Sequence, residues 1–81
     1  MRYFLLGTAG CHLCEEAEAI LSEADIVRLN IKVDRIDIAE QTQWQDEFAT
    51  SIPVLLQPDC REFIAWPFSL ADVLTYIHRT L

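Results

Sequence analysis

Residues 10–17 read GCHLCEEA, and this stretch decides how the rest of the chain is interpreted. It places two cysteines, Cys11 and Cys14, at the start of a segment whose apolar residues follow a helical period. Apolar residues that recur at three- and four-residue spacing form the buried stripe of a helix. The sequence therefore predicts a helix that begins at Cys11 and buries a stripe made of Leu13, Ala17, Ile20, Leu21 and Ala24.

Two cysteines in this position have a specific chemical logic. The first backbone N–H groups of a helix lack partners within the helix, and the helix dipole adds a positive partial charge there. Both effects stabilise a thiolate, which is the reactive form of cysteine. Cys11 at the tip would attack a substrate disulfide, and Cys14, one turn deeper, would attack the mixed disulfide and release the product. We predict these two residues as the catalytic thiols.

The segments around this helix predict an alternation of strands and helices. Residues 2–6 form a short apolar run that is typical of a buried strand. Residues 31–38 predict a second strand with a bulge or an early start near Arg35, because the apolar residues change phase there. Further elements are expected as a helix over 40–49 with Trp44 and Phe48 buried, a hairpin of strands over 54–56 and 62–66, and a last helix capped by Ser69.

The resulting order is β-α-β-α-β-β-α, which predicts an α/β fold. The first βαβ unit should give two parallel strands joined by a right-handed crossover, and helices should cover both faces of a mixed sheet. No linker, repeat or low-complexity stretch interrupts the order, so residues 1–81 are expected to form a single domain.

Composition and charge exclude several classes of function. Of the 81 residues, 52% are hydrophobic, which is enough for a small core without metal or several disulfides. The net charge of −7 argues against binding to nucleic acid or to an anionic membrane. The apolar run at the N-terminus is too short for a signal peptide, so we expect a cytoplasmic monomer in which thiols stay reduced.

The cysteine segment resembles the active-site segment of small glutaredoxin-like proteins of the thioredoxin superfamily. Residues 51–55, SIPVL, resemble the segment of that superfamily in which the proline peptide is cis and packs beside the two cysteines. The resemblance implies a thioredoxin-like, four-stranded mixed sheet with a central first strand, flanked by three helices, and an activity in dithiol–disulfide exchange. It makes Pro53 a site residue and the backbone of Ile52 a partner for an extended substrate. With His12 and Leu13, which lie between the cysteines, these form the predicted substrate-binding residues.

The chain departs from glutaredoxins proper at the positions that bind glutathione. Residues 66–69, WPFS, stand where those proteins carry Gly-Gly and Asp near the last helix, and no cation precedes Cys11. We therefore expect no cofactor, and glutathione would find only backbone N–H groups near Ser69 and Leu70. The expected partners are a disulfide-containing protein or a small thiol substrate, together with an unidentified reductant. Trp66 and Phe68 could form an apolar lip for a protein substrate.

Two other functions stay open at this point. The chain could be a binding or adaptor module that keeps the thioredoxin fold without turnover. It could also bind a metal through Cys11 and Cys14, completed by Cys60 and His12. We predict no metal site, because a second cysteine pair at zinc-binding spacing is missing.

Overall fold

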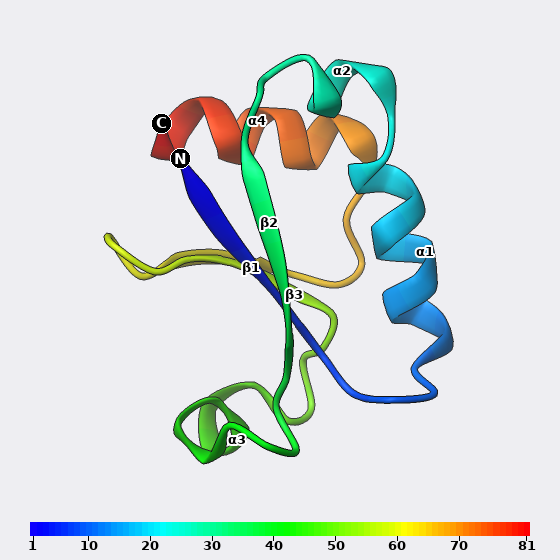
Figure 1. Cartoon of the computed structure of the whole chain (residues 1–81), viewed down its shortest axis with the longest axis vertical. Helices are drawn as coiled ribbons and strands as arrows, with labels where there is room; N and C mark the ends of the chain where they lie inside the picture. The colour runs from blue at the N-terminus through cyan, green and yellow to red at the C-terminus, as the bar shows by residue number, and fades with distance from the viewer.

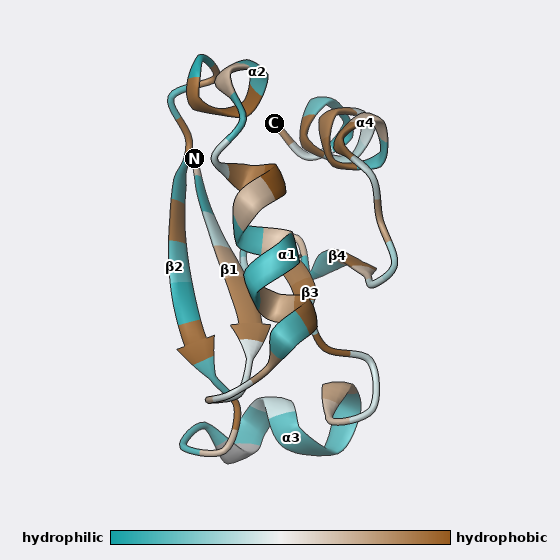
Figure 2. Cartoon of the chain, turned by 90° about the vertical axis from the view of Figure 1, so that its right-hand side faces the viewer, coloured by the Kyte–Doolittle hydropathy of each residue, from teal (hydrophilic) through white to brown (hydrophobic). Residues whose placement is uncertain are grey.

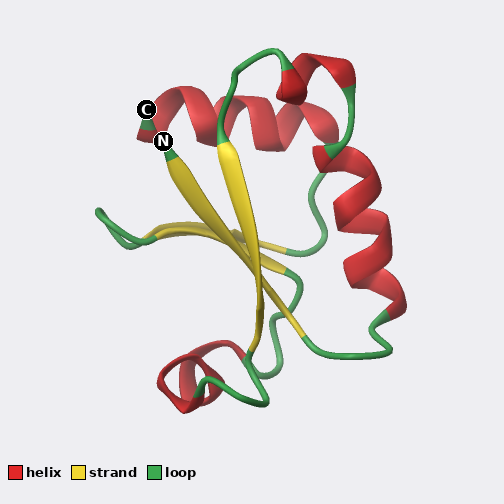
Figure 3. Ribbon diagram, viewed as in Figure 1, coloured by secondary structure: helices red, strands yellow, loops and turns green.

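The computed structural model describes the backbone of residues 1–81 and the side chains of all of them apart from Thr42. Figures 1 and 3 show the strands crossing the middle of the molecule with helices around them. The strands are β1 Arg2–Gly7, β2 Lys32–Asp37, β3 Val54–Gln57 and β4 Glu62–Ala65. The helices are α1 His12–Leu21, α2 Ala24–Val27, α3 Thr42–Phe48 and α4 Leu70–Thr80.

The strands form one mixed sheet in the order β2-β1-β3-β4. β1 pairs in parallel with β2, and the remaining neighbours, β1 with β3 and β3 with β4, are antiparallel. The α/β class, the central first strand and the closing hairpin are therefore as predicted. The one addition to the predicted order is the short helix α2 between α1 and β2.

The predicted bulge near Arg35 is wrong. β2 pairs with β1 without interruption, and Arg35 lies opposite Leu5 in a continuous register. The apolar residues change phase because the strand buries side chains on both faces. Val33 packs against the core on the side of α1, whereas Ile36 packs against the core on the side of α3.

Helices cover both faces of the sheet, as predicted. On one face, residues from β1 and β3 pack with α1, α2 and α4, and the buried members of this cluster are Tyr3, Leu5, Ala17, Ile26, Leu55, Phe68, Val73, Tyr76 and Ile77. On the other face, α3 contributes to a smaller cluster made of Leu6, Ile38, Phe48, Val54 and Leu56. Figure 2 shows α1 in front of the sheet and α3 at its lower end.

The buried stripe of α1 differs from the prediction at both of its ends. Cys14 and Ala17 are its buried residues, whereas Leu13 is 41% exposed. α1 ends at Leu21, and the extended backbone of Glu23 separates it from α2, so that Ala24 lies outside the stripe and is exposed. The predicted placement of Leu13 and Ala24 on the buried face is therefore wrong.

α4 begins with the predicted cap. The Ser69 hydroxyl accepts a hydrogen bond from the Asp72 N–H at 3.2 Å, and the Asp72 carboxylate accepts one from the Ser69 N–H at 2.9 Å. At the other end of the helix, the buried hydroxyls of Thr80 and Tyr3 share a hydrogen bond of 2.7 Å. This bond ties the last turn of the chain to β1. In the part of the chain that the structure describes, no helix is both long and apolar enough to cross a membrane.

Candidate functional site

The cysteine pair lies where β1 passes into α1. A short loop over residues 8–10 follows β1, and the Cys11 N–H donates to the Thr8 carbonyl at 3.3 Å. Gly10 adopts a φ of 76°, a left-handed conformation that glycine reaches without steric cost. The chain turns sharply here, and Cys11 becomes the N-cap of α1, which starts one residue later than predicted.

Cys11 and Cys14 are joined by a disulfide, with their Cα atoms 5.2 Å apart. The Cys14 N–H donates to Cys11 Sγ at 3.1 Å, so the sulfur occupies the place that a capping oxygen usually takes. The two residues differ in access to solvent, because Cys11 is partly exposed and Cys14 is only 9% exposed. The structure therefore brings together the two thiols that the sequence singled out, with the outer one at the helix tip.

Gly7, at the end of β1, makes room for the inner cysteine. A Cβ atom on this residue would lie 2.6 Å from Cys14 Sγ, which is too close for any side chain. The sequence predicts Gly7 only as the first residue of the loop after the strand, with no contact to Cys14. A glycine directly before the loop that leads to a cysteine pair was the available signal for this close approach.

The predicted proline lies at the same end of the sheet. The Ile52–Pro53 peptide bond is cis, Pro53 is buried, and its carbonyl accepts a hydrogen bond from the Trp66 N–H at 2.9 Å. β1 and β3 pair as far as Leu6 and Val54. One further step in this antiparallel register brings Pro53 opposite Gly7, which contacts Cys14. Ile52 is half-buried beside it.

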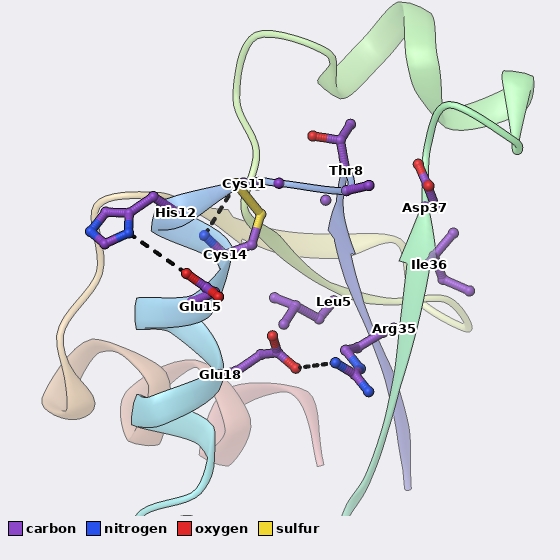
Figure 4. Close-up of a pocket in the computed structure, with 13 residues that line it drawn as sticks. Leu5, Thr8, Cys11, His12, Cys14, Glu15, Glu18, Arg35, Ile36 and Asp37 are labelled. Carbon is purple, nitrogen blue, oxygen red and sulfur yellow. Dashed lines mark hydrogen bonds and ion pairs between the residues drawn. A yellow bond between two sulfur atoms is a disulfide. The ribbon is translucent and has the colours of Figure 1, made fainter.

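His12 and Leu13 lie on the outer surface of the first turn. The His12 ring is well exposed, with Nδ1 3.6 Å from a Glu15 carboxylate oxygen and Nε2 3.9 Å from one of Glu16. In Figure 4 this ring points away from β2. Leu13 presents much of its side chain to solvent. Both residues are therefore accessible next to the partly exposed Cys11.

A cleft of about 550 Å³ opens beside the disulfide, between α1 and β2. Arg35 projects from β2 across this cleft and donates to the Glu18 carboxylate at 2.8 Å (Figure 4). Asp37, at the carboxyl end of β2, accepts a hydrogen bond from the Ala39 N–H at 2.9 Å. The cleft is lined by the loop that joins β1 to α1 and by Leu5, Gly7, Cys11, His12, Cys14, Glu15, Glu18, Arg35, Ile36 and Asp37.

Among the charged residues of this cleft, sequence reasoning missed Glu18, Arg35 and Asp37. The topology of the sheet could have predicted them, because ligands of open α/β sheets bind outside the carboxyl ends of the strands. The register pairs Asp37 with Gly7, so the residue that ends β2 lies beside the residue that ends β1. A parallel β1–β2 pair was predicted, but Asp37 was not connected with the cysteines.

The other residues that were weighed for a role lie elsewhere. The predicted apolar lip is wrong for Phe68, which is 6% exposed and packs in the core with its ring 5.0 Å from that of Trp66. The Ser69 N–H, considered for a carboxylate, is already bonded to Asp72. Cys60 is an exposed free thiol in the turn between β3 and β4. Among the described residues, no group of three or more His, Cys, Asp or Glu side chains is arranged to hold a metal ion.

Comparison with known proteins adds three findings. A family model described as "Glutaredoxin-like domain (DUF836)" matches residues 2–78. A comparison with curated proteins gives no match. Among solved structures, the X-ray structure of target protein XcR50 from X. campestris is similar, with a TM-score of 0.73 and 20% identity over 95% of this chain and 96% of that one. At this level of identity, the likeness shows the fold.

Proposed function

The chain belongs to the family of glutaredoxin-like domains, and from this premise we propose that it is a thiol–disulfide oxidoreductase that works through Cys11 and Cys14. The observation that carries the proposal is the disulfide between a partly exposed cysteine at the tip of α1 and a buried cysteine one turn deeper. Its partners would be a disulfide-containing protein or small thiol substrate and a separate thiol reductant.

The reaction would proceed in two exchanges. Cys11, as a thiolate, attacks one sulfur of the substrate disulfide, forms a mixed disulfide with it and releases the other sulfur as a thiolate. Cys14 then loses its proton and attacks Cys11 Sγ, which releases the second substrate thiolate and leaves the Cys11–Cys14 disulfide. The substrate gains two electrons and the protein loses two. A thiol reductant returns the protein to the dithiol by the reverse sequence of exchanges.

The helix end favours Cys11 as the attacking thiol. The Cys14 N–H points at Cys11 Sγ, and the N-terminal end of α1 carries a positive partial charge. Both stabilise a thiolate at the position that a substrate can reach. Cys14 is held below it against Gly7, too buried for a bulky substrate and close enough to resolve the mixed disulfide.

Four residues would bind the substrate around the reacting sulfurs. Leu13 and His12 offer accessible side chains beside Cys11. Pro53 shapes the adjoining loop, and we propose that the backbone of Ile52, just before β3, pairs with an extended substrate segment. Such pairing adds affinity through main-chain hydrogen bonds without requiring a particular side chain.

A single-turnover experiment tests the proposal. The protein is fully reduced, freed of reductant and mixed with bis(2-hydroxyethyl) disulfide, and its mass is followed after acid quenching. We expect the wild-type protein to pass through a mixed disulfide and to end as the Cys11–Cys14 disulfide, with release of 2-mercaptoethanol. Cys11→Ser should react at the background rate, and Cys14→Ser should stop at the mixed disulfide.

Cys60→Ser is the matched control, because Cys60 is an exposed thiol away from the pair. This variant should react like the wild-type protein. Oxidation of the wild-type protein no faster than that of its Cys11→Ser variant would contradict the proposal and would favour a binding module without turnover.

A further inference from the structure

The cleft beside the disulfide carries more carboxylates than cations. Glu15 and Glu18 line it from α1 and Asp37 lines it from β2 (Figure 4). The guanidinium of Arg35 lines the same cleft and donates to the Glu18 carboxylate at 2.8 Å. Arg35 offsets Glu18, whereas Glu15 has only the exposed His12 ring nearby, at 3.6 Å, and Asp37 bonds to a backbone N–H. The cleft therefore carries three carboxylates against one guanidinium and one imidazole.

We infer that the preferred substrate is a disulfide within a cationic peptide segment, with lysine or arginine beside the cysteine. The inference rests on the proposed function, because it concerns which disulfide Cys11 attacks. A positive flank entering the cleft would meet Glu15 from one wall and Asp37 from the other. A negative flank, such as the carboxylates of glutathione disulfide, would be repelled at the same place.

The walls of the cleft suit the stem of a basic side chain as well as its charge. Leu5, which pairs with Arg35 in the sheet, contributes apolar surface to the cleft. Lysine and arginine bury their methylene stems along such surface while the charged end reaches polar groups. The Asp37 carboxylate is held in place by the Ala39 N–H, so part of this arrangement exists before a substrate arrives.

The size of the cleft and the charge of the whole chain favour a peptide. A volume of about 550 Å³ lies in the range of pockets that hold ligands larger than one side chain. The chain carries a net charge of −7, so its field attracts basic segments from a distance and disfavours acidic ones. Local and long-range charges therefore act in the same direction.

Three disulfide-linked peptide dimers provide the test. Each peptide is acetylated and amidated and carries one cysteine flanked on both sides by lysine, by serine or by glutamate. The second-order rate constant for oxidation of the reduced protein is measured with each dimer, at about 0.1 M and about 1 M salt. Each value is divided by the rate constant of 2-mercaptoethanol with the same dimer, which removes the intrinsic reactivity of the peptide disulfide.

We expect the lysine dimer to react about fivefold faster than the serine dimer at the lower salt concentration, and the glutamate dimer about fivefold slower. At the higher salt concentration the differences should largely disappear, because the Debye length falls to about 3 Å. Glu15→Gln and Asp37→Asn should each lower the lysine-to-glutamate ratio about threefold. A change in the thiolate fraction of Cys11 would alter all rate constants alike and leave this ratio unchanged.

Glu23→Gln is the control variant, because it changes the net charge equally while Glu23 lies at the start of α2, outside the cleft. It should leave the ratio nearly unchanged. Equal rates for the three dimers, or an equal loss of preference in Glu23→Gln, would overturn the inference while the proposed function stands. If no dimer oxidises the protein, the proposed function itself fails and the inference fails with it.

Discussion

Replacing Gly7 by alanine tests whether the end of β1 positions the inner sulfur. The added Cβ would lie 2.6 Å from Cys14 Sγ, and in the oxidised protein the bond to Cys11 prevents this sulfur from turning away. Overpacking of a tightly packed site typically costs about 1–3 kcal/mol. We expect Gly7→Ala to lower the free energy of unfolding by about 2 kcal/mol and the midpoint of thermal unfolding by roughly 8–16 °C.

A double-mutant cycle in urea, followed by tryptophan fluorescence, isolates this contact. The cycle compares Gly7→Ala in the oxidised wild-type background with Gly7→Ala in the Cys14→Ala background. Without the sulfur, the nearest remaining contact is the Cβ of residue 14 at 3.5 Å, an ordinary packing distance. The cost of Gly7→Ala should then fall below about 0.5 kcal/mol, which gives a coupling of about 1.5 kcal/mol. The same cost in both backgrounds would refute the close approach of Gly7 to the sulfur.

Three further predictions concern the surrounding scaffold. Ser69→Ala should lower the free energy of unfolding, measured by urea titration, by about 1 kcal/mol because it removes a helix cap. Ser22→Ala is the control and should lower it by less than half as much. Equal losses of stability in the two variants would speak against the cap. Thr80→Ala should lower the free energy of unfolding by about 1–3 kcal/mol because it leaves the buried Tyr3 hydroxyl without this partner. Thr80→Ser keeps a hydroxyl and should retain most of the stability. If Thr80→Ser is as unstable as Thr80→Ala, the effect comes from packing. Burial, with a smaller effect from Tyr3, raises the pKa of the Tyr76 phenol. Above about pH 10 the unfolded chain therefore releases a proton that the folded chain retains, and the free energy of unfolding should fall with pH. Tyr76→Phe should flatten that fall, and an unchanged slope would rule out this phenol as its source.

Most of the fold follows from local patterns in the sequence. Ser69 and the apolar residues after it predict α4, and the short apolar runs predict the strands, because burial on a helix or strand leaves its own period in the sequence. The same dependence on local patterns led to the wrong prediction of a bulge near Arg35. A strand that buries side chains on both faces shows no regular alternation of apolar and polar residues. Only the tertiary structure shows that Val33 and Ile36 face different helices.

The two cysteines at the centre of the site could also be predicted from the sequence, whereas the charged residues of the cleft around them could not. Cys11 and Cys14 are close in sequence, so the start of a helix is enough to bring them together. Glu18, Arg35 and Asp37 line one cleft only because β1 and β2 pair in a defined register and α1 packs across them. Long-range register and the fit of a sulfur against Gly7 are set by packing of the whole domain, and neither leaves a periodic signal.

The rates at which the three thiols of the reduced protein react with iodoacetamide test most directly which cysteine attacks. Each adduct is located by mass spectrometry after a short exposure at neutral pH, and the exposed Cys60 serves as the internal reference. We predict that Cys11 reacts at least about tenfold faster than Cys14, because Cys11 caps the helix at the surface and Cys14 lies beneath it. Modification of Cys14 as fast as that of Cys11 would contradict the assignment of an outer attacking thiol and an inner resolving thiol.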